Sequence, residues 1–225
     1  YTFQPLGLRV YKKIEKIIRS HMNSLEAQEL LMPALQPKEL WEKSGRWHKL
    51  AGDMYQFKDD SEKEVGLAMT HEEVIVGLLG NQSLSYQNLP LVLYQFQNKF
   101  RHEPRAKSGL LRTREFIMKD LYSIHTSEAD MDEYYEKVKA SYSQIFNDLS
   151  IPTIPTMASG GVFSDNFSHE FQSVADVGED TIYTCPENDY AINKEVLDRL
   201  TLVCPNHQQK LEPAKSVEVG NIFKL

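Results

Sequence analysis

The sequence has few cysteines and no long apolar run, and these two absences narrow its class. Only Cys185 and Cys204 occur among 225 residues, which excludes a disulfide-rich secreted scaffold and fits a reducing compartment. No run of about 18 apolar residues is present, so no membrane span is predicted. The first residues carry no signal-peptide pattern. With 41% hydrophobic and 25% charged residues, the composition predicts a globular enzyme of the cytoplasm.

Glycine-rich nucleotide-binding motifs are also absent. No Walker A or G-x-G-x-x-G pattern occurs, which excludes P-loop and Rossmann chemistry. The net charge of −7 argues against a general DNA-binding face. A local cluster of basic residues nevertheless predicts a site for a compact polyanion such as a triphosphate. Its members are Lys99, Arg101, Arg105, Lys107, Arg112, Arg114 and Lys119, against Glu103 and Glu115.

Hydrophobic periodicity predicts an α+β fold with antiparallel strands and helices packed around them. Helices are expected over 8–25 and 37–44, after an N-cap at Thr70, and after a second N-cap at Thr126. Strands are expected over 29–33, 91–103, 111–122, 168–174 and 180–184, with a hairpin over 54–69. The chain begins at Tyr1 without an initiator Met and ends abruptly at Leu225. We therefore expect the natural protein to continue at both ends.

The segment from 100 to 120 carries the clearest chemical signal. Period-two alternation would place Arg101 and Glu103 on one face of a strand. On the returning strand Arg112, Phe116 and Asp120 would share a face. Arginine can bind phosphate, an aromatic ring can stack on a base, and a carboxylate can accept from an exocyclic amine. This pattern predicts a flat nucleotide platform built from side chains.

Arg-x-Glu, a loop, and then Arg-x-x-x-Phe-x-x-x-Asp resembles motif 2 of the class II aminoacyl-tRNA synthetases. The strings Arg-Glu-Phe-Ile-Met-Lys-Asp and Glu-Val-Gly-x-Ile-Phe are similar to the prolyl enzymes of bacterial type. The resemblance implies the class II catalytic fold, an antiparallel β-sheet flanked by helices. It also implies ATP with Mg²⁺, L-proline and tRNA(Pro) as ligands, and a homodimer with no membrane or DNA partner. The implied catalytic residues are Arg101, Glu103 and Arg112, with Phe116 and Asp120 added for ATP binding.

The same resemblance implies a proline pocket. Thr70-His71-Glu72 resembles the loop that holds the amino group of proline, although a plain N-cap would also explain Thr70. Ser168-His169-Glu170-Phe171 resembles a segment that lines the pocket, although a lone histidine is usually a structural residue. The remaining implied residues are His169, Phe171, Arg101, Met118 and Tyr122 for proline, and Pro33, in a segment resembling motif 1, for the dimer interface.

The sequence departs from this family in three places. Motif 3 and the anticodon-binding domain do not appear, so we expect the chain alone to be inactive. The long editing insertion is replaced by a short insert over 185–212 within a single core of 1–225. Residues 159–166 replace the usual glycine-rich run before the Ser-His-Glu-Phe segment. Two alternatives stay open: a non-catalytic synthetase-like binding protein, and a sister class II synthetase for another small amino acid.

The insert contains two halves of zinc-ribbon turns. They read Cys185-Pro-Glu-Asn188 and Cys204-Pro-Asn-His207, with 15 residues between Asn188 and Cys204. Asn188 is a poor zinc ligand, so only Cys185, Cys204 and His207 remain, with Asp189 as a further donor. The pattern predicts a metal-free remnant rather than a zinc site.

Overall fold

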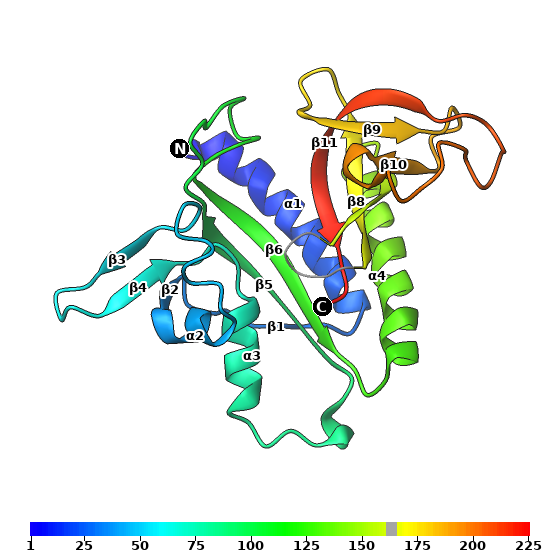
Figure 1. Cartoon of the computed structure of the whole chain (residues 1–225). Helices are drawn as coiled ribbons and strands as arrows, with labels where there is room; N and C mark the ends of the chain where they lie inside the picture. Colours follow the sequence, from blue (N-terminus) through cyan, green and yellow to red (C-terminus); the bar gives the residue numbers. More distant parts are fainter. Residues whose placement is uncertain (161–165) are drawn as a thin grey trace. The chain divides into compact units, whose positions relative to one another are not determined.

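A computed structural model describes residues 1–160 and 166–225 of the chain, so most of the segment 159–166 lies outside the described residues. The chain divides into two compact units (Figure 1). We call residues 22–131 the hairpin unit, and residues 1–21 together with 132–225 the barrel unit. Both helices and strands are present, which confirms the predicted α+β class.

The hairpin unit is named after its two longest strands, β5 and β6, which run side by side in Figure 1. They pair antiparallel, and the two-residue strand β1 pairs parallel to β5. A second, three-stranded sheet has the order β2-β4-β3. The strands are β1 (Gln28–Glu29), β2 (Leu35–Pro37), β3 (Gln56–Lys58), β4 (Glu64–Leu67), β5 (Leu91–Phe100) and β6 (Glu115–Ile124). The helices are α2 (Lys38–Lys43), α3 (Glu72–Gly80) and the short 3-10 helix η1 (Tyr86–Asn88).

Strand β5 is buried on more than one face. Val92 and Tyr94 are buried as the alternation predicts, but Gln95 and Lys99 are fully buried as well. The predicted strand ends are wrong, because β5 stops at Phe100 and β6 starts only at Glu115. Beyond Phe100 two separate backbone bonds link the two arms, from the N–H of Arg101 to the carbonyl of Arg114 at 3.0 Å and from the N–H of Lys107 to the carbonyl of Arg112 at 3.1 Å. The chain then turns away from the ladder.

The other predictions for the hairpin unit have mixed outcomes. The hairpin over 54–69 is confirmed as β3 and β4, and the helix over 37–44 is confirmed as α2. The strand predicted over 29–33 is wrong beyond Glu29. Thr70 is not the N-cap of α3, because His71 occupies that position and makes no side-chain capping bond.

The barrel unit is a small closed barrel with the strand order β10-β7-β8-β11-β9. Most neighbours are antiparallel, and β10 with β7 is parallel. The strands are β7 (Ile154–Ser159), β8 (Phe167–Val174), β9 (Asp180–Thr184), β10 (Ala191–Asn193) and β11 (Glu212–Ile222), with the 3-10 helix η2 (Lys194–Val196). Strand β10 comes from the predicted insert, so part of the insert closes the barrel.

Two long helices begin or end in the barrel unit: α1 (Pro5–Ser24) and α4 (Glu128–Asp148). His21 Nε2 lies 2.8 Å from Asp148 Oδ2 and links them. Ser127, rather than the predicted Thr126, accepts the N–H of Asp130 at the start of α4. Among the described residues, no helix combines the length and the apolar character needed to cross a membrane.

The packing of α4 against the barrel explains the glycine of the Glu-Val-Gly string. Strand β11 shifts register against β8 between Glu218 and Gly220. A Cβ at Gly220 would lie 3.2 Å from the ring of Phe146 on α4. A larger side chain would therefore push the strand away from the helix.

Candidate functional site

A buried polar network lies between β5 and β6. Lys99 Nζ is 2.9 Å from the carboxylate of Asp120. Gln95 Nε2 and the Tyr122 hydroxyl donate to Asp120 Oδ2 at 2.8 and 2.9 Å. Gln95 is the direct cross-strand partner of Asp120, so the sheet register itself places these groups together. The network holds the Asp120 carboxylate in one orientation.

His71 extends this network. Its Nε2 donates to the carbonyl of Pro33 at 3.1 Å, and its Nδ1 accepts from Lys99 Nζ. Burial, together with the positive charge of Lys99, lowers the pKa of His71 to about 4. Burial also lowers the pKa of Lys99. The neutral imidazole therefore accepts a hydrogen bond from the buried amino group of Lys99.

This network was missed from the sequence, where Lys99 was assigned to the basic cluster predicted to bind a polyanion. The polar positions Gln95 and Lys99 recur every fourth residue on β5, opposite a strand that carries Asp120. That spacing was the available signal for a buried polar cluster.

A second group contains three of the residues predicted to bind proline. The Thr70 hydroxyl donates to Glu72 Oε2, and Arg46 NH1 lies 3.7 Å from the same oxygen. Burial raises the pKa of Glu72. Burial, and then the nearby charge of Glu72, raises the pKa of Tyr122. The structure therefore brings Thr70, Glu72 and Tyr122 together beside the buried network.

The predicted nucleotide residues form two pairs. The guanidinium of Arg101 lies 5.3 Å from the centroid of the Phe116 ring, a cation–π distance. Glu103 Oε2 accepts from Arg112 NH1 at 3.4 Å. Arg112 lies before β6, so the prediction that it shares a strand face with Phe116 and Asp120 is wrong.

The face of β6 that carries Phe116 continues through the predicted pocket residues. Phe116, Met118, Asp120 and Tyr122 alternate along the strand and so point to one side. The nearby charge of Glu72 raises the pKa of Lys99, and that of Arg101 lowers it, so both charges lie close to Lys99. Thr70, Glu72, Arg101, Phe116, Met118, Asp120 and Tyr122 thus belong to one neighbourhood of the hairpin unit.

His169 and Phe171 belong to the barrel unit and are each engaged there. His169 Nδ1 lies 2.8 Å from the Tyr135 hydroxyl, which donates to the carbonyl of Ile222 at 3.0 Å. Burial lowers the pKa of His169. Phe171 is fully buried, with its ring 5.5 Å from that of Phe146. Pro33 lies in the hairpin unit with an exposed side chain.

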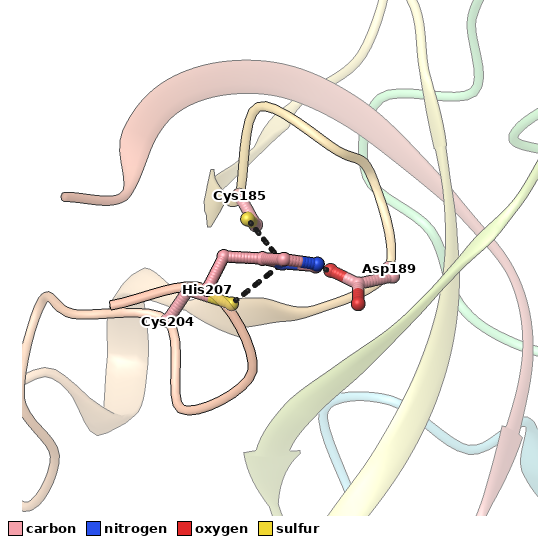
Figure 2. A group of neighbouring side chains, drawn as sticks. All are labelled: Cys185, Asp189, Cys204 and His207. Atoms are coloured by element: carbon pink, nitrogen blue, oxygen red, sulfur yellow. Dashed lines mark hydrogen bonds and ion pairs between the residues drawn. The ribbon is translucent and has the colours of Figure 1, made fainter. Parts of the chain in front are cut away.

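The two cysteines of the insert converge with a histidine and an aspartate (Figure 2). His207 Nδ1 lies 3.5 Å from Cys185 Sγ and 3.6 Å from Cys204 Sγ. The contact with Cys204 raises the pKa of His207. Burial works to raise the pKa of the Cys204 thiol, but hydrogen bonds from His207 and Cys185 lower it below its ordinary value. The group thus pairs an acidic thiol with a basic imidazole.

The fold and the motif 2 hairpin define a class of protein, and a comparison with family models agrees. Residues 55–215 match the tRNA synthetase class II core domain (G, H, P, S and T). The chain belongs to this class II tRNA synthetase core family.

Among individual proteins, the chain is similar to proline–tRNA ligases. The chain is 45% identical over 218 residues to the proline–tRNA ligase of Geobacillus sp. (strain WCH70), covering 97% of this chain and 38% of the relative. It is 43% identical over 222 residues to the proline–tRNA ligase of Staphylococcus haemolyticus, covering 99% of this chain and 39% of that relative. The chain therefore spans less than two fifths of the length of these relatives.

A solved structure supports the fold. The prolyl-tRNA synthetase of Cryptosporidium parvum, crystallised with L-proline and AMP, superimposes with a TM-score of 0.67 at 17% identity. The match covers 77% of this chain and 35% of that one. The class II fold predicted from the sequence is confirmed.

Proposed function

We propose that this chain is the amino-acid-activating part of a proline–tRNA ligase. The reaction joins L-proline to ATP, giving prolyl-adenylate and pyrophosphate, and then transfers proline to tRNA(Pro). The observation that carries the proposal is the grouping of Thr70, Glu72 and Tyr122 in the same unit as the Arg101–Phe116 pair. The identity to proline–tRNA ligases supports it.

Thr70 and Glu72 suit a secondary ammonium. Proline carries two N–H bonds on one positively charged nitrogen, and a carboxylate and a hydroxyl oxygen can accept both. The Thr70 hydroxyl donates its own proton to Glu72, so its oxygen lone pairs remain available to accept. Burial makes ionised Glu72 costly, and a bound cation would restore its charge. Met118 and Tyr122 would supply the walls around the ring.

Arg101 is assigned to the reacting phosphate. A carboxylate oxygen of proline attacks the α-phosphorus, and the bond to the β-phosphate oxygen breaks as pyrophosphate leaves. No protein nucleophile is needed, so positioning and charge stabilisation carry the catalysis. Arg101 would bridge the proline carboxylate and the α-phosphate. Phe116 would stack on adenine, Glu103 would accept from its amino group, and Arg112 would hold the outer phosphates.

The proposal also gives roles to Mg²⁺ and to the predicted residues that lie outside the Arg101 and Thr70 groups. The loop from 101 to 114 has five Arg or Lys residues and a single carboxylate, Glu103, so Mg²⁺ would be held chiefly by ATP phosphate oxygens rather than by a protein cage. Asp120 would act as a positioning residue through its bonds to Lys99 and Tyr122. His169 and Phe171 stay predictions for the pocket, and Pro33 for a homodimer interface. An enzyme of translation would act in the cytoplasm.

The test is proline-dependent ATP–pyrophosphate exchange by the complete gene product. Arg101→Ala should lower the exchange rate by roughly 100-fold or more, on the scale of other lost transition-state donors. Arg9→Ala is the control, because Arg9 is an exposed arginine of α1 and lies outside the basic cluster predicted to bind a polyanion. Near-normal exchange by Arg101→Ala would overturn the assignment.

The alternatives are separated by the choice of amino acid. Exchange with proline alone supports the proposal, and exchange with another small amino acid supports a sister synthetase. Binding of a non-hydrolysable prolyl-adenylate analogue without any exchange supports a non-catalytic binding protein. Calorimetric titration of that analogue into the chain separates loss of binding from loss of chemistry.

A further inference from the structure

Four metal-ligand atoms meet in the insert of the barrel unit, apart from the residues assigned above. Cys185 and Asp189 lie on a turn after β9, and Cys204 and His207 lie on a turn before β11. One ligand atom from each residue lies within 4.8 Å of the other three. Figure 2 shows the side chains pointing toward one another from the two turns.

The distances from His207 Nδ1 to the other three ligand atoms match those of a tetrahedral site. Bonds of about 2.3 Å from zinc to sulfur and about 2.0–2.1 Å from zinc to nitrogen place sulfur and nitrogen about 3.5–3.6 Å apart at tetrahedral angles. The two sulfur–nitrogen distances here are 3.5 and 3.6 Å. His207 Nδ1 lies 3.5 Å from Asp189 Oδ1, against about 3.4 Å expected for such a pair.

The backbone explains how Asp189 replaces the missing fourth ligand. In each turn the cysteine N–H donates to a carbonyl five residues on, Tyr190 and Gln209, at 2.8 Å. Each turn contains one residue with positive φ, Asn188 at 57° and Gln208 at 56°. In the first turn that residue is Asn188 itself, which is left-handed, and the following residue Asp189 faces the cysteines. In the second turn His207 faces them one position earlier.

The surroundings suit a structural metal. Both cysteines are fully buried in an apolar cluster with Ile192, Val196 and Leu211. Asp189 and His207 close the outer side with side chains 40% and 37% exposed, which leaves a path for an ion. Asn206 Nδ2 donates to Asp189 Oδ2 at 2.9 Å and orients the carboxylate.

We propose that Cys185, Asp189, Cys204 and His207 bind one Zn²⁺ as a structural site. Two soft thiolates with an imidazole and a carboxylate fit zinc, and four protein donors leave no open position for catalysis. Binding releases the protons of the two thiols to solvent and leaves the imidazole neutral. The ion joins the turn after β9 to the turn before β11 and so closes the insert.

The test measures metal content and geometry in the 225-residue chain. After reduction, dialysis against Zn²⁺ and removal of free metal, mass spectrometry of the metal should find about one zinc per chain. Replacement by Co²⁺ should give the visible bands of a tetrahedral ion and a near-ultraviolet thiolate charge-transfer band. Zinc well below one per chain, or a cobalt spectrum without the thiolate band, would overturn the site.

Variants assign the ligands. Cys204→Ser should weaken zinc binding by more than about 100-fold, since losing even an outer partner costs 10–100-fold. Asp189→Asn should weaken it by more than about 10-fold, and because its side chain is half exposed the fold should persist. Glu187→Gln is the matched control, a carboxylate of the same turn outside the cluster. Equal zinc affinity in Asp189→Asn and Glu187→Gln would exclude Asp189 as a ligand and leave the tetrahedral site unsupported.

Discussion

The β5–β6 hairpin and the insert over 185–212 both gather charged and polar side chains, but they hold them in different ways. In the hairpin, a ten-residue ladder on each strand sets Gln95 opposite Asp120 and buries Lys99 beside it. In the insert, two short turns bring four donors together, with the three-residue strand β10 and the 3-10 helix η2 between them. The ladder therefore places the polar network of the hairpin, whereas the proposed zinc ion would join the two turns of the insert. The predictions below test that difference.

The largest effect is expected where the ladder buries an ion pair. Lys99→Met leaves the Asp120 carboxylate buried without its ammonium partner, and this should lower the free energy of unfolding by about 3–5 kcal/mol. Urea unfolding of the chain measures it. Lys63→Met, at an exposed lysine between β3 and β4, is the control and should change stability little. A loss below about 1 kcal/mol for Lys99→Met would show that the network does not hold the hairpin.

The neutral state of His71 gives the hairpin a pH dependence. Its folded pKa of about 4 lies below the ordinary 6.5, so the unfolded chain takes up the proton first as the pH falls. The contribution of neutral His71 to the free energy of unfolding is fully present above pH 6.5. It is lost as the pH falls from about 6.5 to 4, to a limit of about 3 kcal/mol.

The contribution is measured by comparing the unsubstituted chain with His71→Gln. For each, the free energy of unfolding is determined between pH 7 and pH 4, and the two changes are subtracted. The variant should lose less stability over this range. His102→Gln, at an exposed histidine, should follow the unsubstituted chain. Parallel curves for the chain and His71→Gln would contradict a neutral His71.

A smaller effect is expected from the orienting partner in the insert. Asn206→Ala removes the hydrogen bond to Asp189 and should weaken zinc binding by about 10–100-fold. Competition with a coloured chelator measures the affinity. Gln209→Ala, an exposed amide of the same turn, is the control. If both variants bind equally, Asn206 does not position the ligand.

The smallest effect is expected at the predicted amino-group site. Thr70→Val removes one acceptor and should raise the KM for proline by about 5–10-fold, or about 1 kcal/mol, with the KM for ATP unchanged. Exchange kinetics of the complete gene product measure both constants. Thr70→Ser keeps the hydroxyl and should restore the KM for proline. An equal rise in both KM values would place Thr70 outside proline recognition.

Local patterns predicted much of the fold. The 3.6-residue periodicity located the long helices, and period-two alternation located β5, β6, β8 and β9. Strand ends were misplaced because residues between Phe100 and Glu115 look extended in the sequence, whereas separate backbone bonds, at Arg101–Arg114 and Lys107–Arg112, replace a continuous ladder there. The N-cap at Thr70 was misassigned because its hydroxyl bonds Glu72 instead of the backbone.

By itself the sequence determined the fold class, the motif 2 residues and the pair of cysteine turns, because each depends on residue types at short spacing. Only the tertiary structure decided that Lys99 is buried rather than exposed, since that depends on His71 and on Asp120 across the sheet. It also decided that Asp189, the further donor named from the sequence, faces the two cysteines and His207. Asn188 is left-handed and directly precedes it, and the two turns meet across the insert.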